Sequence, residues 1–147
     1  MSRVINLDSP GKLRSQLMRT SAEVLRRLGE KSSFDDETRD LVALLIYAFR
    51  EIDEGIDVSV RAWEKRDYWV KAEQFRLRWS WVRDAEHRLT HIIREDEWER
   101  LPMTLVELLP YFSDIKVAKY TRKPSLWNGA YRRLQREHSA GSKQRDS

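Results

Sequence analysis

The sequence contains no cysteine and little glycine or proline, and these shortages limit the fold before any motif is considered. Five glycines and four prolines in 147 residues fit an all-helical chain better than a turn-rich β-sandwich. Without cysteine there are no disulfides, thiolate zinc sites or cysteine nucleophiles, and a reducing compartment is compatible. With three histidines and no glycine-rich phosphate loop, no nucleophile–base pair can be assembled. We therefore predict neither an enzyme nor a cofactor.

Long apolar runs are also lacking. No stretch reaches the roughly 18 apolar residues of a membrane span, so no contact with a membrane is predicted. The first residues, MSRVINLDSPGK, have no apolar core of signal-peptide length. We therefore expect a cytoplasmic protein, and its length suits a single folded domain.

Charge is plentiful but unevenly placed. Residues 115–147 hold nine basic and two acidic residues, whereas the rest of the chain holds 19 basic and 22 acidic residues. A basic segment on a nearly balanced body suggests contact with nucleic acid or an acidic partner, although a solvated basic tail has the same composition. The residues expected to contact phosphates are Lys116, Lys119, Arg122, Lys123, Arg132, Arg133 and Arg136.

Apolar residues recur at helical spacing along the first half of the chain. Ser9-Pro10 indicates the start of a first helix ending near Gly29, and Asp35 or Asp36 starts a second that reaches about Trp63. The second helix has an apolar stripe wide enough to be buried against more than one neighbour. Charged residues lie off the apolar line of the first helix: Arg14, Arg19, Glu23, Arg26 and Arg27.

A tight turn is expected at residues 64–68, followed by a third helix from about Tyr68 to Arg94. In a fourth helix, Thr104 and Glu107 have the spacing of a capping box, and Pro110 should kink the helix. After a break at Pro124, a short amphipathic helix is built on Leu126, Trp127, Tyr131 and Leu134. The final segment, SAGSKQRDS, has the composition of a flexible tail. We predict an all-α, antiparallel up-down four-helix bundle over residues 1–121, and a basic C-terminal helical arm with a flexible tail over residues 122–147.

The segment 63–81, WEKRDYWVKAEQFRLRWSW, holds four of the six tryptophans, interleaved with lysine and arginine. Such interleaving suits base stacking with phosphate neutralisation, but it also describes ordinary core packing. The helical spacing places Trp79 on the core seam and puts Val70, Leu77 and Trp81 on the opposite side. A second apolar face predicts a subunit or protein interface, or a central position for this helix.

Two groups of polar residues have metal-ligand spacing, although neither is complete. His87 and His91 share one helical face but have no clear third ligand. The run Glu51, Glu54 and Asp57 resembles the Mg²⁺-binding helices of all-α nucleotide pyrophosphohydrolases, but the second acidic motif of those enzymes is not clear here. In both cases a solvated helix face is the alternative.

Two resemblances to known families can be stated. The segments VINLDSPGK and AWEKRDYWVKAEQFR resemble a group of small, uncharacterised helical bacterial proteins, which implies no activity. The segment YWVKAEQFRLRWSWVRDAEHRL is distantly similar to the four-helix-bundle family of proteins encoded in 23S ribosomal RNA intervening sequences and of retroelement accessory variability proteins. This second resemblance implies a ring-forming bundle that binds RNA and a reverse transcriptase. The acidic connection at residues 95–99 and the C-terminal concentration of positive charge depart from that pattern.

Three functions remain open from the sequence. The first is a non-enzymatic, oligomeric protein that contacts RNA or DNA through its basic C-terminal arm. The second is a protein–protein adaptor or homo-oligomeric scaffold that uses the Val70, Leu77 and Trp81 face. The third is a metal-dependent phosphohydrolase that uses Glu51, Glu54 and Asp57.

Overall fold

The fold is entirely helical in the residues that the structure, a computed structural model, describes: residues 9–145, with side chains from residue 10 to residue 140. The predicted all-α class is confirmed. Residues 1–8, which precede the helix start predicted at Ser9-Pro10, lie outside the described residues. The elements in chain order are α1 (Ser9–Glu30), α2 (Asp36–Lys65), α3 (Trp69–Arg94), the 3₁₀ helix η1 (Trp98–Arg100), α4 (Leu101–Leu108), the 3₁₀ helices η2 (Leu109–Phe112) and η3 (Pro124–Leu126), and α5 (Ala130–Arg145).

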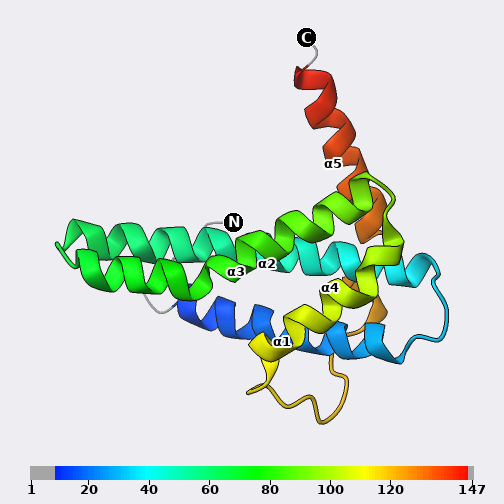
Figure 1. The fold of residues 1–147 in the computed structure, drawn as a ribbon, viewed down its shortest axis with the longest axis horizontal. Coiled ribbons are helices and arrows are strands. Elements are labelled where there is room, and N and C mark those ends of the chain that lie inside the picture. The colour runs from blue at the N-terminus through cyan, green and yellow to red at the C-terminus, as the bar shows by residue number, and fades with distance from the viewer. Residues whose placement is uncertain (1–8, 146–147) are drawn as a thin grey trace.

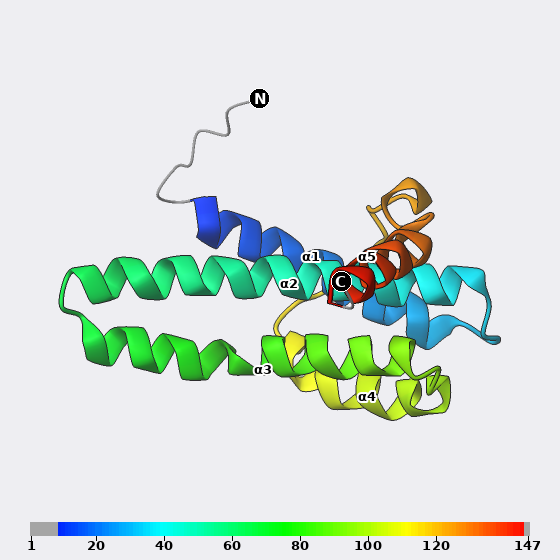
Figure 2. The same cartoon turned by 90° about the horizontal axis from the view of Figure 1, so that it is seen from above.

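Helix α2 is the centre of the fold, and it packs against α1, α3 and α5 (Figure 1). Its wide apolar stripe is buried, including Leu41, Ile46, Phe49 and Val60. The prediction that this helix has several neighbours is confirmed. Helices α2 and α3 lie side by side as a long hairpin, and the end of the hairpin projects beyond α1 and α4 (Figures 1 and 2).

The ends of α2 follow from local chemistry. The Asp35 carboxylate accepts a hydrogen bond from the backbone N–H of Thr38 at 2.9 Å, and the Thr38 hydroxyl completes the capping box. The turn expected at residues 64–68 is present, because α2 ends at Lys65 and α3 begins at Trp69. Asp67 makes the reversal with a φ of 63°, a left-handed conformation that aspartate tolerates better than most residues.

Helix α4 begins earlier than its predicted cap, so the proposed capping box is wrong. Thr104 lies inside α4, where its hydroxyl donates to the carbonyl of Arg100, and Glu107 pairs with Arg88 on α3. The start is set by Pro102, which favours the first turn of a helix. As expected, the α-helix does not continue through Pro110: it ends at Leu108 and tightens into η2.

The C-terminal segment is packed onto the rest of the molecule where it begins. Trp127, Ala130 and Leu134 are buried in the same hydrophobic core cluster as α1, α2 and α3. The Asp40 carboxylate on α2 accepts hydrogen bonds from backbone N–H groups at the start of α5, at 3.2 and 3.0 Å. Helix α5 also runs to Arg145, through most of the expected tail, because no proline interrupts it. Residues 122–134 are therefore docked on the body and do not form a free arm.

None of the helices in the described part of the chain combines the length and the apolar character that a membrane span requires.

Candidate functional site

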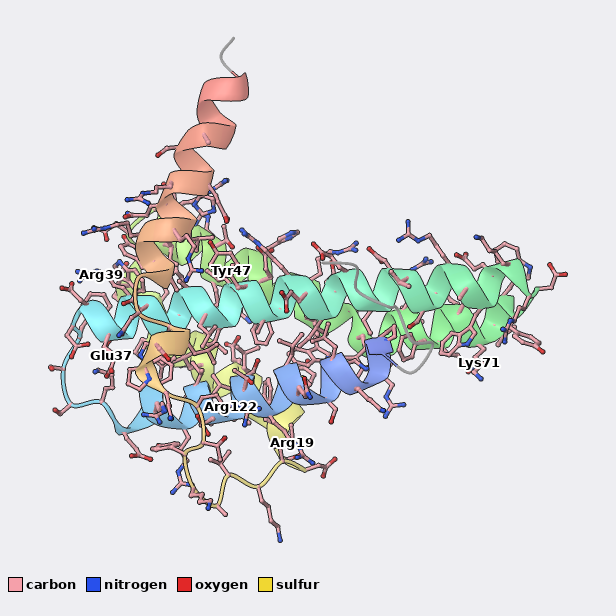
Figure 3. All side chains as sticks on the ribbon, turned by 180° about the vertical axis from the view of Figure 1, so that it is seen from behind. Arg19, Glu37, Arg39, Tyr47, Lys71 and Arg122 are labelled. Atoms are coloured by element: carbon pink, nitrogen blue, oxygen red, sulfur yellow. The ribbon has the colours of Figure 1, made fainter. Side chains whose placement is uncertain are left out.

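The seven basic residues predicted to contact phosphates fall into two separate groups. Four of them belong to the loop between η2 and η3, and three belong to α5. In Figure 1 this loop hangs below α1, whereas α5 rises above α2. Figure 3 likewise shows Arg122 beside α1, and Tyr47 close to α5. The predicted residues therefore do not form one continuous basic surface.

The loop is held against α1 by a buried carboxylate. Glu23 is only 2% exposed and accepts hydrogen bonds from the backbone N–H groups of Thr121 at 2.6 Å and Arg122 at 2.9 Å. The guanidinium of Arg27 lies 3.8 Å from the same carboxylate and packs over the ring of Tyr120, 4.0 Å from its centroid. Glu23 is thus the buried anchor of the loop, which α1 also holds through Arg26, at the carbonyl of Val117, and through Glu30, at the hydroxyl of Tyr120.

Arg122 is occupied by contacts within the chain. Its Nε donates to the Thr20 hydroxyl at 3.0 Å, and its Nη1 donates to the Thr121 hydroxyl at 2.8 Å. The remaining Nη2 donates to the carbonyl of Gln16 at 3.3 Å. Arg122 therefore fastens the loop to α1, whereas Lys116, Lys119 and Lys123 are exposed.

Beside the anchored loop lies a hollow of about 1040 Å³. It is formed by α1, α3, η2 and the loop, and its charged lining comprises six basic and two acidic residues: Arg14, Arg19, Arg78, Lys116, Lys119, Arg122, Glu23 and Asp114. One of the two acidic residues, Glu23, already accepts hydrogen bonds from two backbone N–H groups of the loop. Among the described side chains, Arg122 forms no ion pair, and neither do the other five basic residues of the lining. The hollow therefore carries an uncompensated positive charge.

The same hollow is lined by three aromatic residues. The rings of Trp81 and Tyr111 are stacked, with centroids 4.2 Å apart and an angle of 6° between their planes. The ring of Trp79 also lies near Trp81, with a centroid distance of 6.2 Å and an angle of 29° between the planes. The edges of Phe49 and Phe112 fix Trp81 at centroid distances of 5.8 and 5.7 Å. Cations and aromatic rings from distant parts of the sequence thus meet at one place.

This aromatic stack corrects the predicted apolar face of α3. Trp81 is half-buried and turned toward η2, because Tyr111 and Phe112 offer it aromatic contacts. Val70 and Leu77 remain 72% and 64% exposed, and Val70 lies in the first turn of α3, directly after the hairpin turn. Val70 and Leu77 are therefore a surface pair, and Trp81 does not belong with them.

Arg14 is the most unusual cation of the hollow. Its guanidinium lies 5.1 Å from the centroid of Phe75 and 5.3 Å from that of Trp79, so it is half-buried against aromatic rings. Burial lowers the pKa of Arg14, and the positive charge of Arg78 lowers this pKa further. No sequence pattern indicates a functional role for Arg14, Arg19 or Tyr111, because the residues that they meet come from other elements. The only sequence signal for the two arginines is their position off the apolar line of the first helix.

The two candidate metal groups are not gathered into sites. Arg83 binds Asp53 at 3.0 Å and Asp57 at 3.4 Å, while Glu51 and Glu54 are exposed. His87 and His91 line a smaller hollow of about 560 Å³ and lie 3.5 Å from Glu86 and Glu97, respectively. Among the residues that the structure describes, no three histidine or carboxylate side chains converge as metal ligands do.

Comparison with known proteins adds no functional assignment. No protein-family model matches the chain, and no curated protein or solved structure matches it either. The resemblances noted from the sequence therefore stay predictions, and the site must be interpreted from its own geometry.

Proposed function

We propose that this chain is a non-enzymatic nucleic-acid-binding protein of the cytoplasm. It binds through the basic loop of residues 116–123 together with α1 and α3. The observation that supports this function is the hollow, which is lined by six basic and only two acidic side chains, and in which five of the basic side chains have no hydrogen-bonded partner among the described residues. The lining thus differs from parts of the surface where basic side chains pair with acidic ones, as Arg26 does with Glu30 and Arg83 does with Asp53.

Phosphates are the anions that best suit this surface. Each lysine or arginine that neutralises a phosphate releases condensed counterions from the nucleic acid, and this release favours binding at low salt. The ammonium groups of Lys116 and Lys119 are compact charges at the rim of the hollow, whereas the planar guanidinium group of an arginine can bind two phosphate oxygens at once. Arg132, Arg133 and Arg136 on α5 form a second cationic group, which attracts the polyanion from a distance.

In this proposal the helices serve as a rigid support. Helices α1 to α4 act as an antiparallel four-helix bundle, and α5 is an arm docked on α2. The support matters because the phosphate-binding side chains come from three different elements and keep their spacing only if those elements do not move.

The test is a salt titration of oligonucleotide binding with two variants of equal charge change. Lys116→Gln/Lys119→Gln removes two charges at the hollow, and Arg132→Gln/Arg136→Gln removes two exposed charges on α5. A labelled oligonucleotide is titrated with each protein at several salt concentrations, and fluorescence anisotropy reports the affinity.

We expect the loop variant to lose the larger part of the affinity. The slope of log affinity against log salt should become shallower by about 1.4, since each phosphate contact with a single strand contributes roughly 0.7. The α5 variant should change the slope less. Absent binding, or binding that salt does not weaken, would refute the proposed function, and equal losses in both variants would move the site away from the hollow.

A protein–protein adaptor or homo-oligomeric scaffold is the second candidate, because the first part of α3, after the hairpin turn, exposes Trp69, Val70 and Leu77. Native mass of the wild type and of Val70→Ser/Leu77→Ser distinguishes the two functions. A wild-type oligomer that becomes monomeric in the variant supports the scaffold, whereas a wild-type monomer at high concentration argues against self-assembly through this face.

A further inference from the structure

We propose that the hollow selects single-stranded over double-stranded nucleic acid, with a backbone phosphate bound between Arg14 and Arg78 and an unpaired base stacked on Tyr111. This inference rests on the proposed function and specifies the substrate class of the same site. Two independent features of the hollow support it: an arginine pair without a counterion, and a fixed aromatic platform.

The arginine pair lacks the carboxylate that would normally accompany it. Arg14 comes from α1 and Arg78 from α3, and both line the hollow. Among residues 10–140, neither guanidinium has an ion-pair partner within 4.0 Å. Two neighbouring positive charges, one of them half-buried, repel each other until an anion lies between them. A phosphate has several acceptor oxygens and can take both arginine forks at once.

The aromatic platform is held firmly from behind. One face of the Tyr111 ring is stacked on Trp81, and Trp81 is wedged by the edges of Phe49 and Phe112. Tyr111 itself is 49% exposed and lines the hollow, so the ring face opposite Trp81 is where we place the base. A base that stacks there meets a ring which loses little freedom on binding. The platform reads no hydrogen-bond pattern, so it should accept any base.

A paired base cannot use this platform. In a duplex both faces of each base are covered by neighbouring bases, whereas bases of a single strand can be splayed out and stacked on aromatic side chains. Electrostatics alone would favour the opposite preference, because a duplex has the higher charge density and the steeper dependence on salt. A preference for single strands therefore requires the aromatic platform, and basic charge alone does not produce it.

The experiment compares a labelled single strand with a duplex of the same sequence and length, using the full chain. We expect the single strand to bind at least tenfold more tightly. Tyr111→Ala should weaken single-strand binding about five- to a hundredfold, which is the usual effect of removing one stacking ring. Tyr68→Ala removes a tyrosine of similar exposure at the tip of the hairpin and should leave binding unchanged.

Two further variants separate stacking and charge from folding. Tyr111→Phe keeps the ring and should bind like the wild type, whereas a loss equal to that of Tyr111→Ala would overturn the stacking role. Arg14→Gln should weaken binding and flatten the salt dependence, whereas Arg61→Gln, an exposed arginine on α2 outside the hollow, should do neither. An Arg14→Gln protein that binds like Arg61→Gln would overturn the phosphate site.

The failures of this inference and of the proposed function give different results. If the duplex binds as tightly as the single strand and both are salt-sensitive, the preference for single strands is wrong while nucleic-acid binding stands. If neither ligand binds, the proposed function is wrong and this inference is wrong with it.

Discussion

The buried Glu23 carboxylate gives the most direct test of how this chain builds its candidate site. Replacing Glu23 by alanine removes the acceptor for two backbone N–H groups of the loop and the partner of Arg27. Removing one member of a buried charged pair costs about 3–5 kcal/mol, because the other member stays desolvated and unpaired. The released N–H groups regain water when the loop lifts away, so we expect the lower end of this range, about 3 kcal/mol.

This loss is large enough to measure by thermal and urea unfolding, followed by far-ultraviolet circular dichroism. For a chain of this length, about 3 kcal/mol lowers the midpoint of thermal unfolding by roughly 6–12 °C. Glu30→Gln is the matched control: Glu30 also lies on α1 and also contacts the C-terminal segment, through Tyr120, but it is exposed. Its removal should therefore change the midpoint much less.

The same variant links stability to the candidate site. Without Glu23 the loop loses its buried anchor and keeps its other contacts with α1, such as those of Arg26 and Glu30, so Lys116 and Lys119 are held less firmly at the hollow. We expect faster hydrogen exchange at the amides of Thr121 and Arg122, and weaker oligonucleotide binding at unchanged charge on the loop. An unfolding midpoint no lower than that of Glu30→Gln, with unchanged amide exchange, would refute the anchoring role.

Three further changes test other parts of the fold. Leu134→Ala leaves a cavity where α5 enters the core, and we expect a loss of about 2–5 kcal/mol in urea unfolding. Asp40→Ala removes the acceptor at the start of α5 and should cost about 1 kcal/mol, with faster hydrogen exchange confined to α5. Hydrogen bonds from Lys31 and from the backbone N–H of Thr38 hold the pKa of Asp35 at about 2, below its ordinary value. Because the folded-state pKa is the lower one, this stabilisation is present above about pH 4 and is lost as the pH falls toward 2. The difference in thermal midpoint between the wild type and Asp35→Ala should shrink over that interval.

Much of the helical framework could be predicted because its signals are local. The helical spacing of apolar residues, together with the capping residues, predicts the ends of α2 and α3 to within a few residues. The turn at Asp67 is predicted by the interruption of the apolar pattern there. The wrong prediction of a helix start at Thr104 also has a local cause. Two residues within one turn, Pro102 and Thr104, both favour the start of a helix, and α4 begins at Leu101, directly before the proline. Local rules fail where two of them apply to the same turn.

The candidate site could not be predicted to the same extent, because its contacts are long-range. Glu23 lies off the apolar line of its helix, where a solvent-facing carboxylate is the usual outcome, yet a loop about a hundred residues later covers it. Trp81 was assigned to an outer face from helical spacing alone, but spacing cannot reveal that η2 brings Tyr111 and Phe112 to that face. Sequence patterns identified cations and aromatics as the relevant residue types but did not indicate which of them meet.

The number of basic side chains that are free to contact phosphates determines how steeply salt weakens binding in the proposed function. The seven basic residues predicted from the sequence would give a salt slope of roughly −4.9 with a single strand, if each contacted a phosphate. The structure removes Arg122 from that set, because all three of its nitrogens donate within the chain, and it places three others on α5, away from the hollow. It adds Arg14, Arg19 and Arg78 to Lys116 and Lys119 at the hollow, whose lining does not include Lys123. Five such contacts give a slope of roughly −3.5. A shallow slope combined with a preference for single strands would therefore indicate a site formed by folding, and a steep slope without that preference would indicate a basic segment that acts by composition alone.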